Sequence, residues 1–137
     1  LQENGEAPGR RLGDALYVLG RVKDTVGKLA DAIALYQEAY DIFGRLNDVE
    51  SQLRAAILIG GIHTNLGNYV QAHQWTTAAL VRSRTIGKVE EEAELLTLLG
   101  FIQRLRQRYD SAINYYQQAL SLKNETASED TALLWNN

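Results

Sequence analysis

The chain has 137 residues, of which 45% are apolar, 23% are charged and one is a proline. This composition excludes a disordered polar chain, and the length suits one domain built from unbroken helices. A formal net charge of -3 argues against a broad nucleic-acid-binding surface, which needs clustered lysine and arginine. No apolar run approaches the roughly 18 residues that span a bilayer, so we expect no membrane segment. The absence of cysteine excludes a disulfide framework and a thiolate metal site.

The first third of the sequence predicts two helices behind a polar start. Residues 1–9 are polar and contain glycine, which predicts a flexible leader. From Arg10, apolar residues recur at steps of three and four, which predicts an amphipathic helix that stops at Gly27. A second amphipathic helix follows from Leu29, and we expect it to end at Gly44.

Four further helices follow in the same manner. The sequence at 47–50 is typical of a capping box, and it predicts a third helix from about Asp48 to Leu66. A fourth helix opens at Asn68–Tyr69 and fades before Gly87. The fifth begins with three glutamates that suit the helix dipole and runs to about Arg106, and the sixth covers 109–123.

The spacing of apolar residues found in the earlier helices continues through residues 128–137. This continuation predicts the start of another first helix, belonging to a truncated fourth repeat, and a short capping helix is the alternative. An array cut at this point would expose an apolar C-terminal face, through which the chain could self-associate.

One pattern repeats along the chain at a spacing of forty residues. Gly20, Gly60 and Gly100 are in phase, and each follows an aliphatic residue. Two alanines follow in each copy, and they are Ala32, Ala72 and Ala112, and then Ala39, Ala79 and Ala119. Because glycine inside a helix costs about 1 kcal/mol relative to alanine, we expect these glycines to lie where two helices approach closely. Such helical hairpins cannot bury their apolar faces alone, so neighbouring hairpins must stack.

The leucine-glycine pair, the aromatic start of the second helix and the alanine, tyrosine and alanine that follow resemble the tetratricopeptide repeat, whose usual period is about 34 residues. The 34-residue pattern fits cores at 13–46, 53–86 and 93–126 within an array at 10–127, with six extra residues between cores. This spacing resembles the 40-residue subclass of the Leu-Gly-Asn repeat modulators and of bacterial regulators. The sequence departs from the family at Lys23, His63, Gln103 and Thr76, where aromatic residues are usual, and it lacks the closing proline. The resemblance implies an all-α, right-handed α-solenoid of three hairpins plus the truncated first helix of a fourth.

Residues suited to catalysis or metal binding are few. His63 and His73 are the only histidines, and neither has a second histidine at ligand spacing. The sequence contains no phosphate-binding loop and no arrangement of nucleophile and base, so we expect no enzyme activity, cofactor or metal.

The resemblance also implies a binding site, because the first helix of each hairpin lines the concave face in this family. The residues that this mapping places in the groove are Tyr17, Arg21, Lys28, Ile57, Thr64, Asn65, Asn68, Phe101, Arg104 and Arg108. We expect Tyr17, Ile57 and Phe101 to form an apolar strip along it, flanked by arginines that suit an acidic or phosphorylated segment. The alternative is that these apolar residues tuck against neighbouring repeats.

The sequence therefore predicts a protein–protein interaction module that binds a peptide or protein segment in its concave groove. A self-associating structural scaffold or sensor arm is the alternative. The sequence opens on Leu1 and contains no methionine, from which we expect a piece of a larger scaffold or regulatory protein. The compartment is not fixed by these features, with the cytoplasm favoured.

Overall fold

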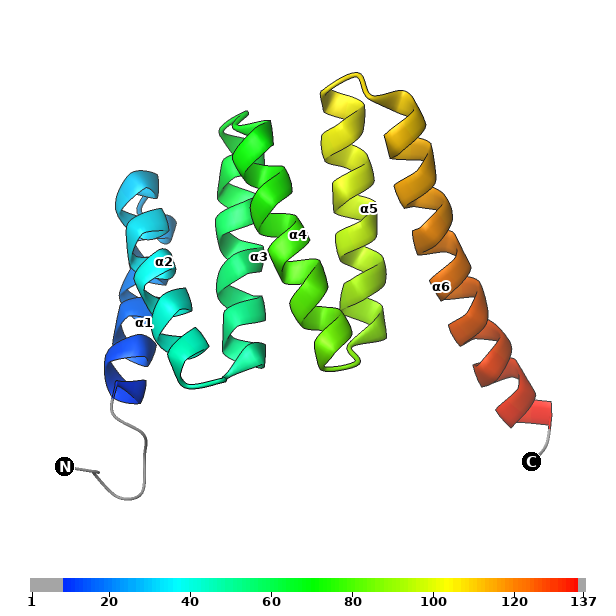
Figure 1. Cartoon of the computed structure of the whole chain (residues 1–137), viewed down its shortest axis with the longest axis horizontal. Helices are drawn as coiled ribbons and strands as arrows, with labels where there is room; N and C mark the ends of the chain where they lie inside the picture. Colours follow the sequence, from blue (N-terminus) through cyan, green and yellow to red (C-terminus); the bar gives the residue numbers. More distant parts are fainter. Residues whose placement is uncertain (1–8, 136–137) are drawn as a thin grey trace.

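A computed structural model of the chain describes residues 9–135, with side chains described for residues 9–127. This part of the chain forms six helices, which are α1 (Arg10–Thr25), α2 (Leu29–Arg45), α3 (Val49–Asn65), α4 (Tyr69–Thr85), α5 (Val89–Leu105) and α6 (Tyr109–Trp135). They stand side by side along the long axis of the molecule (Figure 1). The predicted leader at 1–9 lies outside the described residues except for Gly9.

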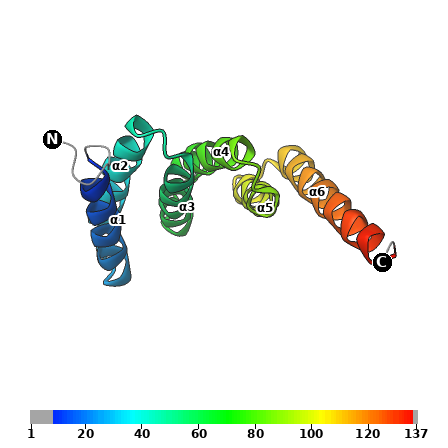
Figure 2. The same cartoon turned by 90° about the horizontal axis from the view of Figure 1, so that it is seen from below.

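Consecutive helices pair into three hairpins, α1–α2, α3–α4 and α5–α6. Contacts of α2 with α3 and of α4 with α5 join one hairpin to the next. Seen from below, α1, α3 and α5 lie along one side of the array and α2 and α4 along the other (Figure 2). The prediction of an all-α helical-repeat solenoid is confirmed.

Two groups of buried apolar side chains hold the hairpins together. One group joins α2 to α3 through Ala32, Tyr36, Ile59 and Ile62. The other extends from α3 to α6, and its buried members are Leu53, Ala56, Ala79, Leu80, Leu95, Leu96, Leu99 and Ala119. The core is thus divided among the junctions, as expected of an array in which each hairpin contacts only its neighbours.

The three in-phase glycines lie where the two helices of each hairpin are in tight contact. A Cβ at Gly20 would stand 2.7 Å from the ring of Tyr36, and a Cβ at Gly100 would stand 2.7 Å from the ring of Tyr116. At Gly60 the obstructing atom is the Thr76 hydroxyl oxygen, at 2.8 Å. The expected close contact at these glycines is therefore confirmed.

Two residues after the end of each helix from α1 to α5 lies a residue with positive φ, so these residues recur every twenty positions. These residues are Gly27, Asn47, Gly67, Gly87 and Gln107. The prediction that Gly44 ends the second helix is wrong, because α2 continues to Arg45 and the left-handed residue is Asn47, with φ of 58°. Gly44 instead lets α3 approach α2, since a Cβ there would meet Gln52 Nε2 at 2.7 Å.

The start of α3 also differs from the expected capping box. Asp48, rather than Asn47, is the N-cap, and its carboxylate accepts hydrogen bonds from the Ser51 backbone N–H at 3.1 Å and from the Ser51 hydroxyl at 2.6 Å. Asn47 is unsuited to the cap because its left-handed backbone closes the preceding turn.

The sixth helix is longer than the sequence predicts. The sequence predicts that it ends near Lys123 and that a new helix begins at 128, but α6 is a single helix to Trp135. Ala127 occupies the next position in the twenty-residue series of turns. Alanine favours the helix and disfavours the left-handed conformation by about 1–2 kcal/mol, so no turn forms there. Residues 136–137 lie outside the described residues.

Candidate functional site

A hollow of about 150 Å³ opens between the first helices of the first two hairpins. Asp14, Tyr17 and Val18 line it from α1, and Ser51 and Arg54 line it from α3. The buried ring of Phe43, on α2, completes the lining between them. The hollow thus combines an apolar surface with a carboxylate on one side and a guanidinium on the other.

Tyr17 links this hollow to the core of the first hairpin. Its ring lies 5.7 Å from the ring of Tyr36, measured between centroids. The Tyr36 hydroxyl oxygen is fully buried, and Asp24 lies near it. Burial, together with the negative charge of Asp24, raises the pKa of Tyr36 to about 12. Tyr36 therefore stays neutral beneath the first-helix surface.

The two other members of the expected apolar strip lie in different surroundings. Ile57 is half-buried and packs against the core group that extends from α3 to α6. Phe101 is also half-buried, and the Arg104 guanidinium lies over its ring at 5.2 Å from the centroid. Such cation–π contacts at partly exposed sites contribute roughly 0.5–1 kcal/mol. The Arg104 guanidinium thus covers one face of the Phe101 ring, and a ligand could contact the same guanidinium.

Three of the predicted groove residues occupy equivalent turns between the two helices of a hairpin. Lys28 and Asn68 are the N-cap residues of α2 and α4, and Arg108 immediately precedes α6. All three are exposed. Asn68 Nδ2 also approaches His63 Nδ1 at 3.4 Å.

The remaining predicted residues lie on α1, α3 and α5. The half-buried Thr64 donates its hydroxyl to the Gly60 carbonyl at 2.8 Å, while Asn65 is exposed at the end of α3. Arg21 and Arg104 are exposed as well. Within the described part of the chain, neither of them, nor Arg108, forms an ion pair, which leaves their charges available to a partner.

The two histidines are at least partly buried, and burial affects the pKa of each. Burial lowers the pKa of His63, and burial together with the positive charges of Arg106 and Arg108 lowers the pKa of His73. His73 Nε2 lies 3.5 Å from the Tyr115 hydroxyl of α6. Among the described residues, no three histidine, cysteine or acidic side chains gather as a metal site would require.

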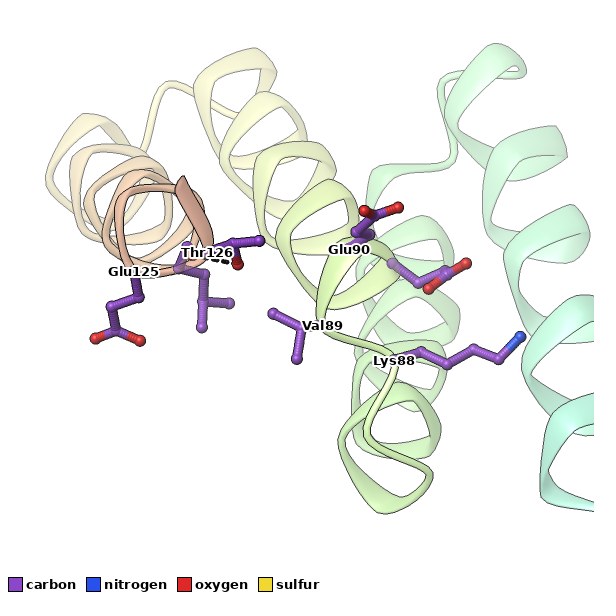
Figure 3. Close-up of a pocket in the computed structure, with 7 residues that line it drawn as sticks. Lys88, Val89, Glu90, Glu125 and Thr126 are labelled. Carbon is purple, nitrogen blue, oxygen red and sulfur yellow. Dashed lines mark hydrogen bonds between the residues drawn. The ribbon is translucent and has the colours of Figure 1, made fainter. Parts of the chain in front are cut away.

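A larger hollow, of about 480 Å³, lies at the other end of the array, between the start of α5 and the middle third of α6. Figure 3 shows Val89 and Glu90 on one side and Glu125 and Thr126 on the other, while Lys88 extends toward α3. A second hollow beside it continues past Ala93 and Glu94 of α5 and past Lys123 of α6. We call the two together the α5–α6 hollow. None of its lining residues is among the predicted site residues, because the sequence predicts a turn and a new helix at this point.

The predicted site residues also omit part of the smaller hollow. Of its lining residues, only Tyr17 belongs to the predicted set. Ser51 shares the first turn of α3 with the N-cap, and Phe43 belongs to a second helix, so neither lies at an expected first-helix groove position. The apolar phase of α2 marks Phe43 as buried, but only the packed hairpins show that its ring closes the hollow.

The stacked hairpins and the first-helix surface define a helical-repeat protein of the kind that binds other proteins. A family model described as Tetratricopeptide repeat matches residues 51–125, and the chain belongs to this family. Repeats of this family generally mediate protein–protein interaction and are typically not enzymes. A comparison with curated proteins finds no match. No described helix is both long and apolar enough to cross a membrane.

Proposed function

We propose that the chain binds a peptide or protein segment along the surface formed by α1, α3 and α5. The observation that supports this most directly is the hollow between α1 and α3, because two successive repeats build it together. A ligand that enters it contacts both repeats at once. A groove formed by two repeats therefore binds a segment of several residues rather than a single side chain.

The hollow suits an apolar anchor of the ligand. Its inner surface is formed by the rings of Tyr17 and Phe43, and its volume of about 150 Å³ admits one side chain of moderate size. Asp14 and Arg54 lie on opposite sides of it, and the Arg54 Nη2 atom donates to the Ser51 hydroxyl at 3.3 Å. Polar groups of both signs at the rim would orient the ligand backbone.

The α5 portion of the surface suits acidic ligand residues. Arg104 is held over Phe101, and Arg108 follows one turn later at the edge. A guanidinium that is already positioned loses less side-chain entropy when it pairs with a carboxylate or phosphate. Equivalent positions on stacked helices lie on the order of 10 Å apart. One bound segment would therefore reach from the hollow, past Ile57, to Phe101.

The forty-residue period supports a place in the 40-residue subclass that the sequence resembles. Membership in that subclass would suit a module inside a larger scaffold or regulatory protein. A second role, self-association, is favoured by a different observation. Leu19 and Val22 in α1 and Leu120 in α6 are exposed, whereas their equivalents in the middle of the array, Ile59, Ile62 and Leu80, are buried.

The test selects ligands from a displayed random-peptide library on the immobilised chain and then measures one selected peptide by fluorescence anisotropy. We expect the double variant Phe101→Ala and Arg104→Glu to abolish binding, because it removes an aromatic surface and reverses a charge. Circular dichroism should stay unchanged and the melting temperature should fall only slightly, since the variant loses a cation–π contact and a half-buried ring but no fully buried side chain.

The matched control carries the same two kinds of change on second helices, Val81→Ala with Arg45→Glu, and should bind like the parent chain. Val81 and Arg45 are exposed on α4 and α2. Equal loss of binding in both variants, or full binding by the Phe101→Ala and Arg104→Glu variant, would contradict a site at the first-helix surface.

A further inference from the structure

We infer that Gly61 determines which ligands the surface of α1, α3 and α5 accepts, because its missing side chain leaves a gap that a large apolar side chain of the bound segment fills. This inference rests on the proposed function, and it names the kind of ligand residue that the same surface selects. The gap lies on α3, which stands between α1 and α5 along one side of the array (Figure 2). We call it the Gly61 gap.

Among the glycines inside the described helices, Gly61 is the one that helix packing does not explain. At each of the others a Cβ would meet a side chain of another helix at 2.7–2.9 Å, and these glycines are Gly13, Gly20, Gly44, Gly60 and Gly100. At Gly61 a Cβ would meet no atom within 4 Å, and the residue lies inside α3, where no left-handed backbone requires glycine. Glycine destabilises a helix interior relative to alanine, so Gly61 weakens α3 without a compensating contact in the described chain.

The gap opens toward the proposed ligand surface. Between residues 54 and 65, the residues that are not buried fall on one face of α3, and they are Arg54, Ile57, Leu58, Gly61, Thr64 and Asn65. The equivalents of Gly61 on α1 and α5, forty residues before and after it, are Arg21 and Phe101, and both are at least partly exposed. A glycine between two such large side chains leaves room for a side chain of the ligand.

The surroundings of the gap favour an apolar side chain. Ile57 and Leu58 lie one turn before Gly61 on α3, and both are half-buried. Thr64 lies one turn after it, and its hydroxyl already donates to the Gly60 carbonyl at 2.8 Å, so this hydroxyl requires no partner from the ligand. An aliphatic or aromatic side chain therefore finds apolar contacts here and leaves the Thr64 hydroxyl paired.

Phe101 extends the apolar surroundings to the next repeat. Gly61 and Phe101 occupy equivalent positions on successive first helices, and such positions lie on the order of 10 Å apart. The Phe101 ring is half-buried, with the Arg104 guanidinium 5.2 Å from its centroid. A large side chain over Gly61 can reach this ring, whereas a small one cannot. The gap thus selects for size as well as for apolar character.

The Gly61 gap and the hollow between α1 and α3 lie along the same helix. Arg54 lines the hollow, and Gly61 follows it after about two helical turns, or roughly 10 Å. The ligand is therefore a segment with two apolar side chains about that far apart, one for the hollow and one for the gap.

The experiment uses a peptide selected on the parent chain from the displayed library and measures its dissociation constant by fluorescence anisotropy. We expect Gly61→Leu to weaken binding by more than about tenfold, and Gly61→Ala to weaken it less, because leucine fills the gap. The urea midpoint of both variants should equal or exceed that of the parent, since both residues favour the helix more than glycine does. Ala34→Leu, at an exposed position of α2, is the matched control and should bind like the parent.

A second measurement identifies the ligand residue. Each large apolar residue of the peptide is replaced by alanine in turn, and every peptide is measured on the parent chain and on the Gly61→Leu chain. One replacement should weaken binding to the parent by more than about tenfold but change binding to Gly61→Leu much less, because the leucine has already excluded that side chain.

Several results would overturn this inference. If Gly61→Leu binds like the parent while the Phe101→Ala and Arg104→Glu variant does not, the gap is unused although the proposed function stands. A Gly61→Leu chain that is less stable than the parent shows that the protein itself needs the space. Equal effects of every peptide replacement on the parent and on Gly61→Leu show that no ligand side chain fills the gap. A library that yields no peptide contradicts the proposed function and this inference together.

Discussion

Glycine has two separate uses among the residues of this chain. Gly67 has φ of 78° and open space around its missing Cβ, so it serves the turn between α3 and α4. Gly60 lies inside α3, and its missing side chain admits Thr76 of the facing helix. Gly61, the next residue, has no neighbouring atom within 4 Å of the position that a Cβ would occupy, so neither use applies there.

This difference predicts opposite effects at neighbouring positions. Gly60→Leu should lower the free energy of unfolding by about 1–3 kcal/mol, because the new side chain overpacks the contact with Thr76. Gly61→Leu should be neutral or stabilising by up to about 1 kcal/mol, since leucine favours the helix more than glycine does. Chemical denaturation of the two variants measures both values. If both variants change the free energy of unfolding equally, the contact with Thr76 does not limit the size of the side chain at residue 60.

The lengths of the helices depend on which residue stands at each twenty-residue turn position. Glycine occupies three of these positions, and Asn47 and Gln107 also adopt positive φ. At the next position the helix continues through Ala127. The exposed alanine is the best helix-forming residue, so the helix continues through it, and α6 extends past the first residues of α5 (Figure 1).

Ala127→Gly should therefore introduce a turn and shorten α6. The change weakens the helix by about 1 kcal/mol and removes a left-handed penalty of about 1–2 kcal/mol, so it favours the turn by roughly 2–3 kcal/mol. NMR chemical shifts of the Cα atoms should move away from helical values at 126–128. Ser121→Gly, at an exposed position of α6 outside the turn series, should leave them helical. Helical shifts through 127 in both variants would contradict the turn rule.

At the scale of the whole molecule, the sequence predicts the repeat well because one spacing acts on every element at once. The predicted start of α1 and the predicted start of α2 agree with the structure, and the predicted end of α3 is one residue late. The predicted helix ends are wrong at positions where the same residue type can serve two structural roles. In the sequence Gly44 resembles a helix end, but it serves the approach of Gln52. The extension of α6 depends on the balance between one alanine and a turn.

The candidate site follows from the sequence only in part. The resemblance to the tetratricopeptide repeat places residues such as Tyr17 and Phe101 on the first-helix surface, and their contribution to binding stays a prediction. It does not show that Arg104 lies over Phe101 or that Phe43 closes a hollow between α1 and α3. Both features depend on rotamers and on the angle between hairpins, which a spacing in the sequence does not determine.

The stability of the whole array should depend on pH through its two histidines. The pKa values of His63 and His73 are lowered from the ordinary 6.5, mainly by burial. Above pH 6.5 both folded and unfolded chains hold neutral imidazoles, so the histidines add no pH dependence. As the pH falls below that value, the unfolded chain binds protons first, and the free energy of unfolding decreases until the folded histidines also titrate.

Urea unfolding at about pH 7.5 and about pH 5.5 measures this loss. We expect the parent chain to be less stable at the lower pH, and the double variant His63→Gln and His73→Gln to lose less stability over the same interval. The lowered pKa of Asp48 does not interfere, because the stability it adds is lost only below its ordinary value of 3.8. An equal loss in the parent chain and the double variant would show that the histidines are not held neutral by the packing of α3, α4 and α6.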